Sequence, residues 1–167
     1  MESPTNKMKI VAPKRELLMI KGMMPSDVTS IKSLFQREGC LDSENPFDDQ
    51  DQCIALDDIQ TRLASTHKTN KKASADLLVV ADGKKIILAD AKFKVSKTSN
   101  LSFKEAESKD RGSKGIISTQ LSYYAKFLLV FKKSILTPSA KNQLKRKFNE
   151  SPKYDFLTAT EFYHLFH

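Results

Sequence analysis

Three charged side chains interrupt two apolar segments near the middle of this chain, and their types and spacing could support metal-assisted hydrolysis. Asp76 precedes the apolar run 77–81, and the run 86–89 leads directly into Asp90-Ala91-Lys92. A buried charge is costly unless it is paired or binds a metal. Two carboxylates and a lysine on neighbouring strands therefore suit a divalent-metal site for phosphodiester cleavage.

The two apolar segments flank an Asp-Gly turn at 82–83, which predicts a β-hairpin. A two-residue loop would place Asp76 and Asp90 on opposite faces, because side chains alternate along a strand. A three-residue loop, 82–84, sets Asp76 directly opposite Asp90, with Cβ atoms ~5 Å apart, and brings Lys92 to the same face. We expect the longer loop or an equivalent bulge. Two such close like charges repel, and a bound cation is the simplest way to stabilise them.

The composition indicates one globular domain that does not enter a membrane. The chain has 167 residues, of which 40% are hydrophobic and 29% charged, as in ordinary soluble proteins. It contains neither the ~20 consecutive apolar residues of a membrane span nor the apolar core of a signal peptide. Cys40 and Cys53 lack the spacing of a zinc site or a disulfide framework. We expect an intracellular, cytoplasmic protein with a flexible segment at 1–14 and a single domain at 15–167.

The charge distribution indicates a polyanionic partner. The formal net charge is +8, yet residues 42–58 contain seven acidic residues and no Lys or Arg, so the rest of the chain carries about +15. Such an excess favours nucleic acid, although it also serves solubility. The acidic stretch itself reads as a solvated loop, but it could mimic nucleic acid or supply a metal ligand.

Hydrophobic periodicity and turn signals predict the remaining elements. The first half contains a short helix or strand at 16–20, a helix that begins at 25–27 and stops at Gly39, and a strand at 53–56. The segment 59–66 either extends that strand or forms a helical turn. The second half contains a long, mobile loop at 94–115, a helix at 115–131, a basic helix at 138–148, a strand at 155–158 and a capping box at 158–161 that opens a terminal helix.

The charged residues of the hairpin and a later pair of residues resemble the motifs of a known family. Asp76, the tripeptide Asp90-Ala91-Lys92 and the pattern Gln120-x-x-x-Tyr124 are similar to the motifs of the PD-(D/E)XK nuclease superfamily, and in particular of its RecB-like branch. The resemblance covers about residues 74–130. It implies an α/β fold with a restriction-endonuclease-like core, in which helices flank a mixed central sheet, and it implies a metal-dependent nuclease that acts on DNA.

The resemblance also implies roles for individual residues. Asp76, Asp90 and the backbone carbonyl of Ala91 would hold Mg²⁺ or Mn²⁺, since hard cations prefer oxygen ligands. Lys92 would position the attacking water or neutralise the scissile phosphate. Gln120 and Tyr124, on one face of the predicted helix, would orient Lys92 or the phosphate. The remaining candidates are an upstream acid, either Glu38 or Glu16, and four residues for binding nucleic acid, Lys94, Lys97, Arg111 and Lys114.

Two other functions fit the same sequence. A nuclease scaffold without activity could bind nucleic acid or a regulatory partner, and no upstream residue matches the family's further acid. A protein-interaction module could use the acidic stretch to dock on a basic partner. In the nuclease interpretation the small chain would rely on a homodimer, a protein partner or the shape of its substrate for targeting. Endo- and exonucleolytic cleavage, and DNA and RNA substrates, are not distinguished.

Overall fold

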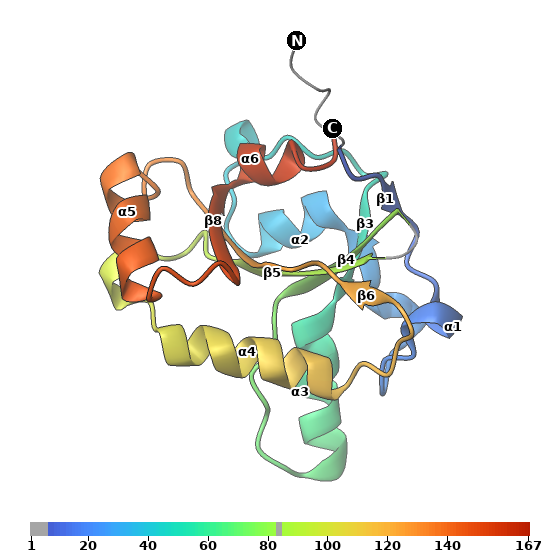
Figure 1. Ribbon diagram of the computed structural model, residues 1–167. Coiled ribbons are helices and arrows are strands. Elements are labelled where there is room, and N and C mark those ends of the chain that lie inside the picture. The colour runs from blue at the N-terminus through green and yellow to red at the C-terminus, as the bar shows by residue number, and fades with distance from the viewer. Residues whose placement is uncertain (1–6, 83–84) are drawn as a thin grey trace.

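A mixed eight-stranded sheet forms the centre of the molecule, with helices on both of its faces (Figure 1). The computed structural model describes residues 7–82 and 85–167. The strands are β1 (Ile10–Val11), β2 (Val28–Ser30), β3 (Gln52–Ala55), β4 (Leu77–Ala81), β5 (Lys85–Ala91), β6 (Ser122–Tyr123), β7 (Phe127–Phe131) and β8 (Tyr154–Thr158). The predicted α/β class with a mixed central sheet flanked by helices is confirmed.

The sheet joins an antiparallel half to a parallel half at β5. Its strand order is β2-β3-β4-β5-β7-β8, and β1 pairs with β4 while β6 pairs with β5. Strands β2 to β5 pair antiparallel, whereas β7 is parallel to β5 and β8 is parallel to β7. A parallel neighbour requires a crossover connection, and a helix supplies each one in this half of the sheet.

Six α-helices and three short 3₁₀ turns complete the described part of the chain. The helices are α1 (Arg15–Leu18), α2 (Ile31–Arg37), α3 (Leu56–His67), α4 (Phe103–Gly115), α5 (Pro138–Lys147) and α6 (Ala159–Tyr163), and the turns are η1 (Pro25–Asp27), η2 (Asp42–Glu44) and η3 (Thr98–Asn100). In Figure 1, α2 and α6 lie above the sheet, α3 and α4 lie below it, and α5 lies at its β8 end.

The two faces of the sheet bury two separate apolar cores. Leu78, Val80, Ile86 and Leu88 point towards α3, α4 and α5, while the alternate residues of β4 and β5 point towards α2 and α6. This alternation is the period of two expected of a strand. Asp76 and Asp90 continue the first series by parity, so they belong to the face that α4 covers.

The hairpin register is confirmed. Ala81 pairs with Lys85 and Leu77 pairs with Ala89, which is the pairing that a three-residue loop requires. Asp82 takes a left-handed conformation, with φ of 54°. Gly83 and Lys84, the other two residues of the predicted loop, lie outside the described residues.

The predictions for residues 94–131 were wrong. The expected mobile loop at 94–115 contains α4, and the expected helix at 115–131 is an extended segment that holds β6 and β7. The five residues of β7 are all buried, because a parallel strand packed on both faces reads as a continuous apolar run rather than an alternating one. The apparent helical stripe arose from this run.

The other elements agree with the sequence more closely. Helix α2 begins at Ile31, later than expected, because Val28–Ser30 forms β2 and Ser30 caps the helix. The uncertain segment 59–66 lies within α3, and the acidic stretch contributes β3. Helix α5, strand β8 and the capping box of α6 are confirmed.

The beginning of the described chain differs from the predicted loose end. Ile10 pairs with Ala81 and Val11 with Val80, so β1 joins the sheet beside the end of β4. The short apolar pair lies between polar and proline residues, and that context concealed it.

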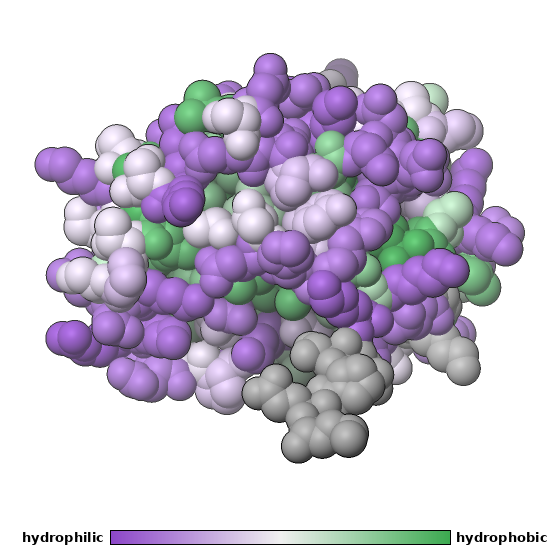
Figure 2. All heavy atoms as spheres, turned by 90° about the horizontal axis from the view of Figure 1, so that it is seen from above, coloured by the Kyte–Doolittle hydropathy of each residue, from purple (hydrophilic) through white to green (hydrophobic). Residues whose placement is uncertain are grey.

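The outer surface above α6 is dominated by hydrophilic side chains, with apolar ones in small separate areas (Figure 2). No helix in the described residues is long and apolar enough to cross a membrane.

A close backbone contact fixes α4 against the segment that leads into β4. A Cβ atom placed on Gly112 would lie 1.9 Å from the carbonyl oxygen of Ala73. The side chain of Gln60, on α3, donates a hydrogen bond of 2.9 Å to the carbonyl of Gly112. Glycine at this position therefore lets α4 approach both α3 and the residues that precede Asp76.

We predict that Gly112→Ala destabilises the protein by about 1–3 kcal/mol, because overpacking against backbone forces a shift. In an open helix the same change would stabilise by up to about 1 kcal/mol. Gly115→Ala is the matched control, since a Cβ there meets nothing within 4 Å. Thermal unfolding measures both, at about 2–4 °C per kcal/mol for a chain of this size. Equal melting temperatures for the two variants would contradict the contact.

Candidate active site

The carboxyl groups of Asp76 and Asp90 meet at the end of the β4–β5 hairpin that lies against α4. The N–H of Asp76 donates to Asp90 Oδ1 at 3.2 Å, and the N–H of Ala91 donates to Asp76 Oδ2 at 2.8 Å. Each carboxylate is thus held by the main chain of the opposite strand. The predicted convergence of these two acids is confirmed.

Asp90 is a buried charge with two cationic partners. Its side chain is 1% exposed, and its Oδ2 lies 2.9 Å from Lys92 Nζ and 2.6 Å from Lys109 Nζ. Both lysines are themselves largely buried. A carboxylate can enter an apolar core only with such pairing, because desolvation of an unpaired charge is very unfavourable.

The two carboxyls titrate in opposite directions. Burial raises the pKa of Asp76 to about 8, and the neighbouring charge of Asp90 adds to the rise. Burial alone would also raise the pKa of Asp90, but Lys92 and Lys109 outweigh it and lower that pKa. Asp90 is therefore the permanent anion of the pair, and Asp76 is the carboxyl that lacks a compensating positive charge.

Lys109 is the site residue that sequence reasoning missed. It lies on α4, where burial opposes its charge but Asp90 raises its pKa above the ordinary range. The carboxylate of Glu105, one turn earlier, lies 3.7 Å from its ammonium. The available signal was Ser102, which caps α4 by accepting from the Glu105 N–H at 3.3 Å; the pattern Ser-x-x-Glu marks the start of a helix.

Ser113 ties α4 to the residues that lead into Asp76. Its hydroxyl accepts the N–H of Ala75 at 2.8 Å, lies 3.2 Å from Ser74 Oγ, and donates to the carbonyl of Lys109 at 2.7 Å. Because Ser113 is buried, these bonds replace contacts with water. The helix that carries Lys109 therefore also fixes the backbone position of Asp76.

The predicted placement of Gln120 and Tyr124 at this site was wrong. Both lie in the extended segment around β6, and the N–H of Tyr124 donates to the carbonyl of Ile86 at 2.8 Å. Asp90 lies four positions after Ile86 along β5, a distance of about 13 Å along a strand. The pair therefore lies near the opposite end of β5 from the carboxylates.

The two candidates for the upstream acid do not join the carboxylates. Glu38 caps the end of α2, and its carboxylate lies 3.6 Å from the Nε of Arg37. Glu16 is exposed on α1, beside the chain around Thr119, whose hydroxyl donates to the carbonyl of Leu17. Within residues 7–82 and 85–167, no three His, Cys, Asp or Glu side chains are grouped closely enough to hold a metal ion.

The predicted nucleic-acid contacts divide into free and paired cations. Lys94, Lys97 and Arg111 are exposed, and none of the three forms an ion pair within the described part of the chain. Lys114 lies 3.2 Å from Asp110 and 4.9 Å from the centre of the Tyr123 ring, so its charge is already partnered.

The residues at this site fit a hard divalent cation in part. Mg²⁺ commonly takes one or two protein carboxylates and completes its shell with water and phosphate oxygens. Asp76 offers an oxygen, Oδ1, that accepts no hydrogen bond from the described residues, whereas both oxygens of Asp90 are engaged. A cavity of about 10 Å³ beside Asp90, lined also by Lys92, Glu105 and Lys109, has room for about one water-sized centre.

We predict that Asp76→Asn raises stability at pH 8 more than at pH 5. The folded protein holds the Asp76 proton more tightly than the unfolded chain, because the folded pKa is about 8 and the ordinary value is 3.8. That contribution is complete below pH ~4 and is lost as the pH rises towards 8. Asparagine keeps the acceptor for Ala91 without titrating. Metal-free thermal unfolding between pH 5 and 8 measures the difference.

The matched control for this measurement is Asp49→Asn, a change at an exposed acid. Its melting temperature relative to the native chain is expected to stay constant over the same pH range. If the Asp76→Asn curve ran parallel to that of the native chain, the raised pKa of Asp76 would be refuted.

We predict that Lys109→Met destabilises the metal-free protein by about 1–3 kcal/mol, because the buried carboxylate of Asp90 loses one of its two cationic partners. Lys114→Met removes a lysine of the same helix whose side chain is 40% exposed, and we expect a loss below about 1 kcal/mol there. Urea unfolding compares the two variants. Equal losses would mean that Lys109 adds nothing beyond a surface ion pair.

Comparisons with protein-family models, with curated proteins and with solved structures give no match for this chain. Its relation to the PD-(D/E)XK superfamily therefore stays a prediction from the motif residues.

Proposed function

We propose that this protein is a divalent-metal-dependent nuclease that hydrolyses phosphodiester bonds of DNA. The observation that carries the proposal is the meeting of the buried carboxylate of Asp90 with the half-buried carboxyl of Asp76 and with Lys92 on one face of a hairpin. A helix, α4, follows the acid-bearing hairpin, although it does not occupy the predicted residues 115–131. On this proposal the sheet and α4 form a restriction-endonuclease-like core.

Asp76, Asp90 and the Ala91 carbonyl are the proposed ligands of Mg²⁺ or Mn²⁺. The bound cation would stabilise negative charge on the phosphate and lower the pKa of a coordinated water. Asp76 is suited to this because a cation beside it would replace the proton that burial favours. Asp90, already ionised, needs no proton loss.

Lys92 is the proposed group that contacts the attacking water or the scissile phosphate. Its ammonium is anchored at 2.9 Å from Asp90, and its side chain is 14% exposed. The N–H of Lys92 also donates to the carbonyl of Val130 at 2.7 Å, so the start of its side chain is fixed by the sheet. A lysine held in this way presents its charge without having to be ordered when substrate binds.

Lys109 is the proposed positioning residue. In the metal-free protein it neutralises Asp90, and the nearby carboxylate of Glu105 offers it a second partner when a cation takes that role. The positive charge of the chain outside the acidic stretch favours a polyanionic substrate. Lys94, Lys97 and Arg111 are the exposed residues proposed to contact its backbone.

A second candidate function is a nuclease-fold protein without activity that binds nucleic acid or a protein partner. One observation favours it: Lys92 and Lys109 together already neutralise Asp90, and no group of three metal-ligating side chains occurs in the described residues. Both functions predict salt-sensitive binding to DNA, so cleavage and metal binding are the properties that separate them.

We predict that Mn²⁺ supports cleavage of plasmid and single-stranded DNA by the native chain. Asp90→Asn and Lys92→Ala should each lower the rate at least ~100-fold, the scale of loss for a group that stabilises charge in a transition state. Gln120→Ala and Tyr124→Phe are matched controls, because both residues lie away from the carboxylates, and they should keep most of the activity.

The metal-binding arm uses thermal unfolding with and without Mn²⁺. A ligand that binds only the folded state raises its melting temperature, and we expect this rise in the native chain but not in Asp76→Asn. If Mn²⁺ neither raises the melting temperature nor supports cleavage, the nuclease proposal fails. DNA binding retained in that case would favour the inactive scaffold.

A further inference from the structure

We propose that a cavity between the C-terminal ends of α3 and α4 binds one nucleotide unit of a nucleic-acid strand, with its phosphate held by Lys21, His67 and Lys72. The inference rests on the proposed nuclease function, for which this cavity would be a second substrate contact. It concerns a part of the surface separate from the carboxylate site, and its evidence is independent of a metal.

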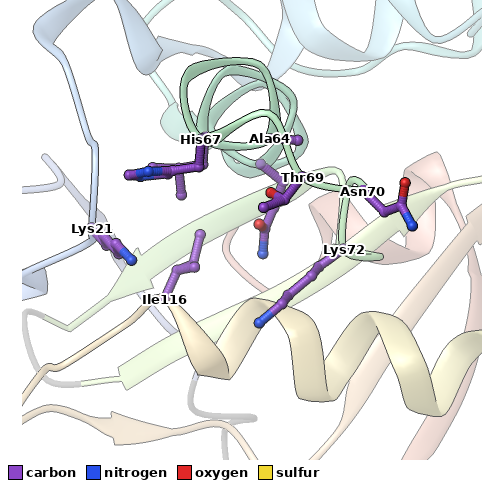
Figure 3. A pocket seen from close by; sticks show the side chains of 9 residues that line it. Lys21, Ala64, His67, Thr69, Asn70, Lys72 and Ile116 are labelled. Atoms are coloured by element: carbon purple, nitrogen blue, oxygen red, sulfur yellow. The ribbon is translucent and has the colours of Figure 1, made fainter.

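The cavity measures about 260 Å³ and none of the residues that line it is acidic. Lys21, His67 and Lys72 surround Ile116 in Figure 3, and Thr69 and Asn70 extend the polar wall. Ammonium, imidazole, hydroxyl and amide groups all donate hydrogen bonds. A wall of donors with positive charge and no competing carboxylate suits a phosphate group.

Three separate segments build this cavity, namely the chain after α1, the stretch 60–72 and the end of α4, and main-chain hydrogen bonds hold them together. The N–H of Lys21 donates to the carbonyl of Ile116 at 2.8 Å, which joins the chain after α1 to the end of α4. Lys68 ends α3 in a left-handed conformation, with φ of 52°. The N–H of Thr69 then donates to the carbonyl of Ala64 at 3.0 Å, which turns the chain back along the helix.

The lysines of the cavity are available for a ligand. Within the described residues, neither Lys21 nor Lys72 forms an ion pair. Lys71, the neighbour of Lys72, is instead bound to Asp57 at 2.7 Å and does not line the cavity. Of the two adjacent lysines, Lys71 is neutralised by a carboxylate, whereas Lys72 lines the cavity and has no carboxylate partner among the described residues.

The size and floor of the cavity favour a nucleotide unit over a bare phosphate. Leu63, Ala64 and Ile116 supply apolar surface beneath the cationic groups, on which a sugar or base can pack. The volume lies just below the ~300–1,000 Å³ range of drug-sized ligand sites. One nucleotide therefore fits, while a larger ligand would extend out of the cavity, as a strand does.

The position of the cavity fits a strand that passes the carboxylates. Helix α4 carries Lys109 at the candidate active site and ends beside Ile116, seven residues further on, which is about 10 Å along its axis. That length corresponds to about three steps of ~3.4 Å along one strand of duplex DNA. Arg111, exposed between these two points, lies on the same helix.

The test measures binding of a 5′-labelled oligo(dT) strand of about 20 nucleotides to the full chain in EDTA, by fluorescence anisotropy over a series of salt concentrations. We expect Lys21→Ala and Lys72→Ala each to weaken binding about 5-fold or more. Each should also reduce the slope of log K against log salt by about 0.7, the value for one lost phosphate contact on a single strand. Lys72→Gln, which keeps most of the side chain, should behave like Lys72→Ala.

Lys71→Ala is the matched control, because it removes the same net charge one residue away from Lys72 but outside the cavity. The proposal is overturned if the cavity variants bind no more weakly than this control. It is also overturned if AMP binds the cavity, as judged by a melting-temperature rise lost in Lys21→Ala, while oligo(dT) binding is unchanged. The cavity would then serve a free mononucleotide.

The same measurements separate this inference from the proposed function. If the native chain cleaves no DNA with Mn²⁺ but the cavity variants lose oligo(dT) binding, the binding site stands without the nuclease. If the native chain cleaves DNA and the cavity variants bind like Lys71→Ala, the nuclease stands without this site.

Discussion

The burial of one carboxylate, that of Asp90, constrains the structure on this side of the sheet. Asp90 lies at 1% exposure on a strand whose neighbours on that face are Ile86 and Leu88. Its charge is acceptable there only because Lys92, Lys109 and the N–H of Asp76 surround it. Lys92 directly follows β5, Asp76 directly precedes β4, and Lys109 lies on the crossover helix. Helix α4 must therefore pack against the end of the β4–β5 hairpin, with Lys109 turned towards Asp90.

That constraint explains why the sequence pattern did not predict α4. The buried residues of this helix are Ala106, Asp110 and Ser113, and the helix also turns Lys109 inward. A helix is normally recognised by apolar residues on its inner face, but here that face carries the polar side chains that hold Asp90 and the start of β4. These inward polar residues replaced the apolar pattern by which the helix would have been recognised. Only the Ser102 cap remained, and a cap alone does not define a helix.

The hairpin could be predicted because the length of its loop determines which residues pair and which face each side chain occupies. Once the turn holds an odd number of residues, the alternation of side chains sets Asp76 opposite Asp90, and the structure has this register. The motif Gln120-x-x-x-Tyr124 failed for the converse reason, because its spacing carries meaning only on a helix. The segment is extended, since Phe127–Phe131 fills a strand between β5 and β8. Local spacing was therefore reliable where the turn determined it, and unreliable where tertiary packing did.

The pKa values of the two carboxyls shift in opposite directions because the positive charge at the site is unevenly distributed. Two anions and two ammonium groups would balance, yet both lysines lie on the Oδ2 side of Asp90, and burial together with the charge of Asp90 raises the pKa of Asp76 to about 8. Asp90 is therefore paired with two ammonium groups, whereas Asp76 is paired with none among the described residues. A divalent cation placed between them would remove the asymmetry, because it can compensate Asp76 and release one lysine from Asp90. Helix α4 would transmit such a change, since it carries Lys109, holds Asp76 through Ser113 and ends at the cavity beside Ile116.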